Sequence, residues 1–228
     1  TQGIVQKEDI TENGIKYIKQ DGSVGYYQTV NKTTPVAGDV KYVDRNGDGV
    51  VDDNDRDIIG NPNPDFTYGF QTKVSWKSLS LSASFNGVQG RDILNVGNRY
   101  NNTPGTKSNN VTRKAFQNMW TDENPSNLYP KSTFVVQNMV MDRYVEDGSY
   151  LRCSDITLSY ILPAKWTNKI GIKNTSVYAS VKNAFVITDY SGYDPEVNSF
   201  AFDGLRPGVD MNSYPTPRSF VFGLNLTF

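Results

Sequence analysis

The sequence predicts an all-β protein of long antiparallel strands that are apolar on one face and polar on the other. Three observations predict this fold class. Apolar and polar side chains alternate over several stretches, the connections between these stretches alternate between short and long, and 12% of the 228 residues are aromatic. Alternation with a period of two predicts strands whose two faces have different surroundings, and aromatic residues are enriched in strands.

The first two strands are expected to form a hairpin. Residues 66–76 read FTYGFQTKVSW, and only Thr72 interrupts the apolar face of this segment. After Lys77 and Ser78 the alternation restarts and continues over residues 79–88. Two alternating segments joined by so short a connection are typical of a β-hairpin.

Three more strands are expected further along the chain, at about 149–162, 173–187 and 217–228. The apolar residues of the first change parity near Cys153 and Ser154, and a β-bulge there would return them to one face. Asn183 interrupts the apolar face of the second. The third has five alternate apolar residues, ending at Phe228.

The strand lengths and the connections favour a transmembrane β-barrel. Eleven residues at ~3.3 Å each, tilted by ~45°, span roughly 26 Å, which matches an outer-membrane apolar band of ~25 Å. Short connections fall at one end of the strands, and residues 1–65, 89–149 and 188–216 at the other. Outer-membrane barrels have short periplasmic turns and long extracellular loops. We therefore expect these three segments to be extracellular and the C-terminus to be periplasmic.

Three aromatic residues are expected at the short-turn edge of such a barrel. Trp76, Trp166 and Phe228 all fall at this edge in the predicted topology. Trp and other aromatic side chains gather where the membrane meets water, so these residues are predicted to form part of an interfacial girdle.

Composition excludes several classes of function. The chain has 23 Lys and Arg against 24 Asp and Glu, so it offers no basic surface for nucleic acid. It contains no His, which removes Ser-His-Asp catalysis and His-containing zinc sites. Its single cysteine, Cys153, cannot form an internal disulfide. No stretch approaches the ~18–20 apolar residues of a transmembrane helix.

The segment 44–55, DRNGDGVVDDND, matches the ligand order of an EF-hand calcium loop. The predicted ligands, at positions one, three, five, seven, nine and twelve, are Asp44, Asn46, Asp48, the carbonyl of Val50, Asp52 and Asp55. Gly49 stands at position six, where the loop turns sharply, but Asp replaces the usual Glu at position twelve. We predict a structural Ca²⁺ site; the alternative is an Asx-rich turn without an ion.

The long connections contain further candidate residues. Asp194, Glu196, Asp203 and Asp210 form an acidic cluster in 188–216. Paired carboxylates serve glycosidases, but their separation is not readable from sequence, so we expect a solvated loop and no catalytic pair. The aromatic candidates for contact with a substrate or partner are Trp120, Tyr190, Tyr193, Phe200, Phe202 and Tyr214. The alternative is that these rings pack within the loops.

Two local elements are also expected in the long segments. Residues 14–30 predict a hairpin that turns at Asp21 and Gly22. Residues 111–120 predict a short helix that ends before Asn124 and Pro125. No internal repeat and no domain boundary is evident.

Four segments together carry a family resemblance. They are residues 38–70, 147–163, 177–197 and 215–228, and they follow one another in the expected order. The chain resembles the C-terminal part of a SusC/RagA-type TonB-dependent outer-membrane transporter. The resemblance implies the C-terminal strands of a large, 22-stranded antiparallel transmembrane β-barrel with long extracellular loops. It also implies an N-terminal plug that contacts TonB, and a SusD-like surface lipoprotein that closes the barrel as a lid during import of glycans or peptides.

The five predicted strands cannot close a barrel, because the smallest bacterial barrels have about eight. We therefore expect the plug, the TonB contact and the remaining strands on missing sequence or on another chain. In this interpretation the chain is part of a transporter and has no catalytic role, and the loop aromatics contact the substrate or the lid. The alternative interpretation is a secreted, soluble, calcium-binding β-rich domain that binds carbohydrate or acts as an adhesin.

Overall fold

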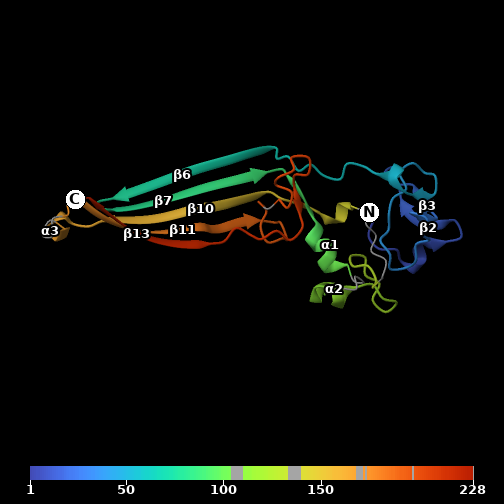
Figure 1. Ribbon diagram of the computed structural model, residues 1–228. Coiled ribbons are helices and arrows are strands. Elements are labelled where there is room, and N and C mark those ends of the chain that lie inside the picture. Colours follow the sequence, from blue (N-terminus) through green and yellow to red (C-terminus); the bar gives the residue numbers. More distant parts are fainter. Residues whose placement is uncertain (104–109, 133–139, 168–171, 173, 197, 228) are drawn as a thin grey trace. The chain divides into compact units, whose positions relative to one another are not determined.

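The computed structural model describes residues 1–103, 110–132, 140–167, 172, 174–196 and 198–227 (Figure 1). The chain forms two compact units. We call the first the core unit; it comprises Thr1–Gly60 and Leu94–Val145. We call the second the sheet unit; it comprises Asn61–Ile93 and Glu146–Phe228.

The core unit is built from short elements. Its strands are β1 (Ile10–Thr11), β2 (Gly14–Ile18) and β3 (Val24–Tyr27), which form one antiparallel sheet, and β4 (Thr29–Val30) and β5 (Val50–Val51), which pair in parallel. Its helices are α1 (Val96–Asn102) and α2 (Arg113–Asn118), with single 3₁₀ turns η1 (Lys7–Asp9), η2 (Asp53–Asp55) and η3 (Asp142–Tyr144). A further sheet, in the order β12-β8-β9, is formed by β8 (Asp92–Asn95), β9 (Val145–Asp147) and β12 (Val209–Asp210). β12 belongs to the sheet unit, and β8 and β9 contain the points where the chain passes from one unit to the other.

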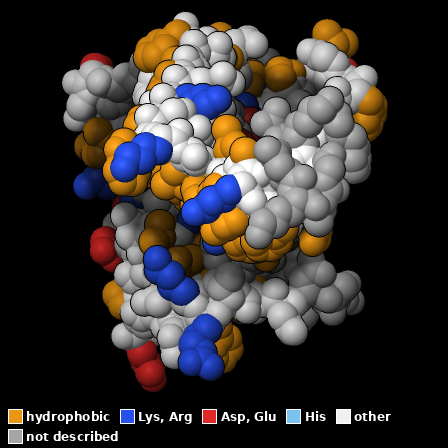
Figure 2. All heavy atoms as spheres, turned by 90° about the vertical axis from the view of Figure 1, so that its left-hand side faces the viewer, with side chains coloured by type: hydrophobic (Ala, Val, Ile, Leu, Met, Phe, Trp, Pro, Cys, Tyr) orange, Lys and Arg blue, Asp and Glu red, His pale blue; other side chains and the backbone are white. Residues whose placement is uncertain are grey.

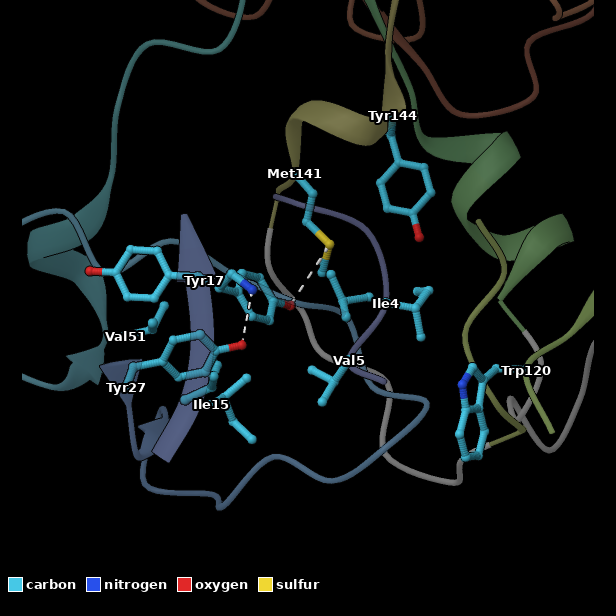
Figure 3. Packing of buried hydrophobic residues seen from close by; sticks show 12 residues of the cluster. Ile4, Val5, Ile15, Tyr17, Tyr27, Val51, Trp120, Met141 and Tyr144 are labelled. Carbon is cyan, nitrogen blue, oxygen red and sulfur yellow. Dashed lines mark hydrogen bonds between the residues drawn. The ribbon is translucent and has the colours of Figure 1, made fainter. Parts of the chain in front are cut away.

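Side chains from both segments of the core unit share one hydrophobic core (Figure 3). Tyr17 and Tyr27, from β2 and β3, pack with their ring centroids 5.9 Å apart. The Tyr42 N–H donates a hydrogen bond to the Tyr27 hydroxyl at 3.1 Å, and the Tyr42 hydroxyl lies 3.8 Å from the Met141 sulfur. Residues predicted as two separate extracellular segments, 1–65 and 89–149, therefore fold together because they bury each other's apolar side chains.

The hairpin expected at 14–30 is confirmed, since β2 pairs with β3 across a turn in which Gly22 has φ +80°. The helix expected at 111–120 is shorter, because α2 covers only Arg113–Asn118. Thr112 caps its N-terminus by accepting a hydrogen bond from the Ala115 N–H at 3.1 Å. In the described parts of the chain, no helix is long and apolar enough to cross a membrane.

The sheet unit is dominated by five long antiparallel strands in the order β13-β11-β10-β7-β6 (Figure 1). They are β6 (Phe66–Trp76), β7 (Leu79–Gln89), β10 (Tyr150–Ile161), β11 (Asn174–Thr188) and β13 (Ser219–Thr227), and the four-residue helix α3 (Ala164–Thr167) follows β10. Within the described residues, the observed ends agree with the predicted strands to within two residues. The alternation of side chains was therefore sufficient to locate these strands.

The register places the apolar residues of all five strands on one face, which we call the apolar face. One row across the sheet consists of Val74, Leu81, Leu158, Ala179 and Phe222. The pairing shifts between Cys153 and Asp155, which confirms the predicted bulge. Next to this bulge, Cys153 on β10 pairs with Phe85 on β7 and with Phe185 on β11.

Candidate functional site

The apolar face of the sheet is exposed. Phe222 retains 79% of its accessible surface, and Phe220, Val74, Ile187 and Leu224 are also exposed. Some rings pack against one another along the face: the Phe70 and Phe85 centroids are 4.5 Å apart in a stacked arrangement. A continuous exposed apolar surface of this kind requires a nonpolar environment, since in water it is an aggregation hazard.

The opposite face, which we call the polar face, consists mainly of small polar and charged side chains. Asp155 accepts hydrogen bonds from Thr157 and Ser180, each at 2.8 Å, and forms an ion pair with Lys182 at 2.5 Å. The hydroxyls of Ser75 and Ser80 lie 2.8 Å apart on neighbouring strands. The sheet therefore has the opposite arrangement to a soluble sheet, which packs its apolar face into a core.

At the end of the sheet away from the short turns, the polar face binds the connection between β11 and β13. Arg152, which is 5% exposed, forms ion pairs with Asp194 at 2.5 Å and with Glu196 at 2.6 Å. Tyr150 donates a hydrogen bond to Glu196 at 2.6 Å. The Thr216 N–H donates to the second oxygen of Asp194 at 3.0 Å. We call Tyr150, Arg152, Asp194 and Glu196 the Arg152 cluster; it holds the loop to the strands.

The expectation that all the acidic residues of this loop are solvated is wrong for Asp194 and Asp210. Both carboxylates are buried, and Asp210 accepts a hydrogen bond from the Tyr190 hydroxyl at 2.7 Å. Burial raises the pKa of Asp194, but backbone N–H donors and the Arg152 charge outweigh it and hold that pKa below its ordinary value. These carboxylates therefore organise the loop, because each has a partner that compensates for its burial.

The aromatic candidates divide into packed and exposed rings. Trp120, only 8% exposed, belongs to the core of the core unit, and its indole N–H donates to Gln6 at 3.0 Å. Tyr190 is buried beside Asp210. The packing alternative holds for these two residues. Tyr193, Phe202 and Tyr214 are exposed. The rings of Phe200 and Phe202 meet edge-on, with their centroids 6.3 Å apart.

Two of the three predicted girdle residues, Trp76 and Trp166, lie at the end of the sheet where its short connections are. Trp76 ends β6 and is 68% exposed, while Trp166 lies in α3 and is 58% exposed. The Ser78 carbonyl, in the β6–β7 turn, accepts a hydrogen bond from the Ile161 N–H at 2.8 Å. This bond joins the turn to the end of β10, shortly before α3. Phe228 lies outside the described residues.

Segment 44–55 forms a compact loop closed by its own side chains. Asp44 is buried and accepts hydrogen bonds from the Gly47 and Gly49 N–H groups, at 2.7 and 2.8 Å. Asp55 accepts from the Arg45 N–H at 2.7 Å and from the Asp52 N–H at 2.9 Å.

Three more predicted ligands, Asn46, Asp48 and Asp52, accept hydrogen bonds from backbone N–H groups within the loop. Asn46 accepts from the Asp48 N–H and Asp48 from the Val50 N–H, each at 2.9 Å. Within the described residues, no three Asp, Glu, Cys or His side chains converge closely enough to hold a metal ion. The loop thus has the Asx-turn hydrogen bonds of the alternative interpretation, and the ion itself remains a prediction.

Sequence reasoning did not identify Arg152 as a site residue. The alternation places Arg152 on the polar face, but its partners lie 42 and 44 residues further along the chain in a connection without periodicity. Only the pairing of β10 with β11 and β7 brings these groups together. The only available signal was a charged residue inside a predicted strand.

Long antiparallel strands with an exposed apolar face, a polar reverse face and extended loops at one end define the class: this is the wall of an outer-membrane-type β-barrel. Comparisons with known proteins agree. The chain is 35% identical over 201 residues to a TonB-dependent receptor of Formosa agariphila, covering 85% of this chain and 20% of the relative. It is 34% identical over 194 residues to the TonB-dependent receptor SusC of Bacteroides thetaiotaomicron, covering 82% of this chain and 17% of SusC. No family model matches.

Comparisons with solved structures indicate the same family. A structure of the RagAB peptide importer in the open-open state aligns with a TM-score of 0.68 and 25% identity, over 99% of this chain and 21% of that chain. A structure of the RagAB peptide transporter aligns with a TM-score of 0.64 and 29% identity, over 75% of this chain and 18% of that chain. The chain is a segment homologous to SusC/RagA-type TonB-dependent receptors. It spans about a fifth of the length of the relatives it matches.

Proposed function

We propose that this chain forms part of a TonB-dependent importer in the bacterial outer membrane. The sheet unit supplies five strands of the barrel wall, and its loops lie on the extracellular side with its short connections in the periplasm. The observation that carries this proposal is the exposed apolar face, which extends across all five strands. In this arrangement the apolar face contacts lipid and the polar face lines the interior.

The partners and the cargo are proposed from the relatives. RagAB is described as a peptide importer, and SusC as a TonB-dependent receptor. We propose import of a peptide or glycan, a SusD-like surface lipoprotein as the lid, and TonB acting through a plug region outside this sequence. The exposed rings Tyr193, Phe202 and Tyr214 are the candidates for contact with cargo or lid. These residues shape a passage, and no catalytic role is proposed for them.

Membrane extraction tests this proposal. The full-length gene product should remain in the outer-membrane fraction after washing with carbonate and with high salt, and should be released only by detergent. A protein that either wash releases is not held by a lipid-facing sheet. Such a result would favour the secreted calcium-binding β-rich domain.

Affinity purification tests the proposed partner. A tagged full-length protein, extracted in mild detergent, should carry a surface lipoprotein with it. Replacing the exposed rings Tyr193, Phe202 and Tyr214 together by Ser should weaken this association or reduce uptake of cargo. Because these rings are exposed, the triple variant should keep the thermal stability of the parent protein. Unchanged association and unchanged uptake would remove these residues from the proposed contact.

A structural Ca²⁺ in loop 44–55 is a separate proposal. It is supported by the order of oxygen ligands along the sequence and by the left-handed backbone of Gly47 and Gly49, with φ of +80° and +84°. Ca²⁺ should protect residues 38–65 from protease, and the Asp44→Ala/Asp48→Ala variant should lose this protection. Asp53→Ala, outside the predicted ligand set, is the matched control. Equal cleavage of the parent protein with Ca²⁺ and with chelator would refute the site.

A further inference from the structure

The short-turn end of the sheet carries two Lys–Trp pairs. Trp76 and Lys77 lie where β6 turns into β7, and Lys165 and Trp166 lie in α3. All four side chains are exposed. Figure 1 shows α3 at the same end of the sheet as the β6–β7 connection, and Figure 2, which faces this end, shows Lys and Arg side chains next to hydrophobic ones.

The side chains of Trp76 and Lys77 contact each other. The Lys77 ammonium lies 4.8 Å from the centroid of the Trp76 ring, which is cation–π distance. This contact keeps the ammonium at the level of the indole. Indole rings locate at the headgroup level of a membrane, so the ammonium is held at the depth of lipid phosphates.

Lys77 also occupies an unfavourable backbone position. It is the first residue of a two-residue hairpin turn and has φ +53°. Gly and Asn are the favoured residues in such turns because they tolerate positive φ. Local turn chemistry therefore does not favour Lys at this position.

Charge is distributed unevenly between the two ends of the sheet unit. The described strand ends and turns near the short connections, 72–83, 156–167, 174–181 and 220–227, contain Lys73, Lys77 and Lys165 and no Asp or Glu. The long connection 188–216 at the opposite end has five acidic residues and one Arg. A positive end with indole rings complements an anionic headgroup layer.

We propose that the short-turn end of the sheet, at Trp76–Lys77 and Lys165–Trp166, is a binding surface for anionic glycerophospholipid headgroups. This inference rests on the proposed function, because it requires that the sheet spans a membrane. The bound lipids are phosphatidylglycerol-like lipids of the periplasmic leaflet. The ammonium groups contact the phosphates, and the indole rings lie beside the glycerol backbone.

Quenching of Trp76 fluorescence by brominated lipids tests the proposal. The full-length gene product is reconstituted in vesicles of phosphatidylcholine and phosphatidylglycerol in which only one lipid is brominated. The Trp76 signal is obtained by subtracting the spectrum of a Trp76→Phe variant. We expect brominated phosphatidylglycerol to quench with about fivefold preference over phosphatidylcholine at low salt. This preference should fall at high salt because charge screening weakens it.

The Lys77→Asn/Lys165→Gln variant should lose most of this preference. Asn suits the turn better than Lys, so loss of preference without loss of stability separates lipid binding from a structural role. Arg206→Gln, which removes one charge from the opposite end, should leave the preference unchanged.

The outcomes distinguish this inference from the proposed function. Equal quenching of the parent protein by both lipids would overturn only the headgroup preference. Absence of quenching by either lipid would overturn the membrane placement itself. Preference for vesicles that contain lipid A over phosphatidylglycerol would also contradict the proposal, because the surface would then face the outer leaflet.

Discussion

The two units of this chain use apolar side chains in opposite ways. In the core unit, Tyr17, Tyr27 and Ile4 are almost completely buried, and the exposed side chains of β2 and β3 alternate with them. In the sheet unit, Phe222 and Val74 are exposed, while the polar residues Ser180 and Arg152 are buried. Period-two alternation therefore identifies a strand and its two faces, but the surrounding medium determines which face points outward.

Disruption of the Arg152 cluster should destabilise the sheet unit more than any other change considered below. Arg152→Met leaves the buried Asp194 without its cation, which should cost about 3–5 kcal/mol of stability and release the loop 188–216. Thermal unfolding in detergent and protease cleavage within the loop measure this. The double variant Arg152→Met/Asp194→Leu should recover part of the loss, and equal loss in both variants would contradict charge burial as the cause.

The second prediction concerns the direction in which the sheet faces. Phe222→Arg places a charge near the middle of the apolar face and should cost about 2–4 kcal/mol or block assembly. Val221→Arg, its neighbour on the polar face, should be mild because the side chain points into a wet interior. Assembly yield and resistance to unfolding of the full-length protein measure both effects. Equal effects would remove the distinction between the faces.

The third prediction probes the core unit. Tyr17 donates a hydrogen bond to the Asp44 carbonyl at 2.6 Å. Tyr17→Phe leaves this buried carbonyl without its donor and should cost about 1–2 kcal/mol, detected as faster hydrogen exchange around loop 44–55. Tyr26→Phe, on the exposed face of the same sheet, should have no measurable effect. If both variants exchange alike, the buried face of β2 does not stabilise the loop.

The smallest expected effect is a pH dependence of the loop. The folded state lowers the pKa of Asp194, so its stabilising contribution is present above the ordinary carboxyl pKa and is lost as pH falls through the lowered value. A spin label at the exposed Tyr193 should be immobile at neutral pH and gain mobility only below about pH 4. Mobility that rises already near neutral pH would indicate that a different group holds the loop.

The sequence predicted the strands of the sheet unit better than the packing around them. Strand positions and the bulge at Cys153 followed from side-chain parity, which is a local property. The packing of Trp120 was predicted only as an alternative, and the pairing of Arg152 with Asp194 was not predicted, because both depend on contacts between distant segments without periodicity. The EF-hand-like order of residues 44–55 predicted a tight turn, but residue order alone does not specify whether carboxylates bind an ion or backbone N–H groups.

The most direct test of the central claim is a nitroxide scan along β13 in the full-length protein, with Cys153→Ala to remove the native thiol. Labels at Phe220, Phe222 and Leu224 should be accessible to lipid-dissolved oxygen, and labels at Val221 and Asn225 to an aqueous nickel chelate. This alternation would identify the apolar face as the lipid-facing surface. Labels at the first three positions that neither reagent reaches would show a protein interior there, and would contradict the account.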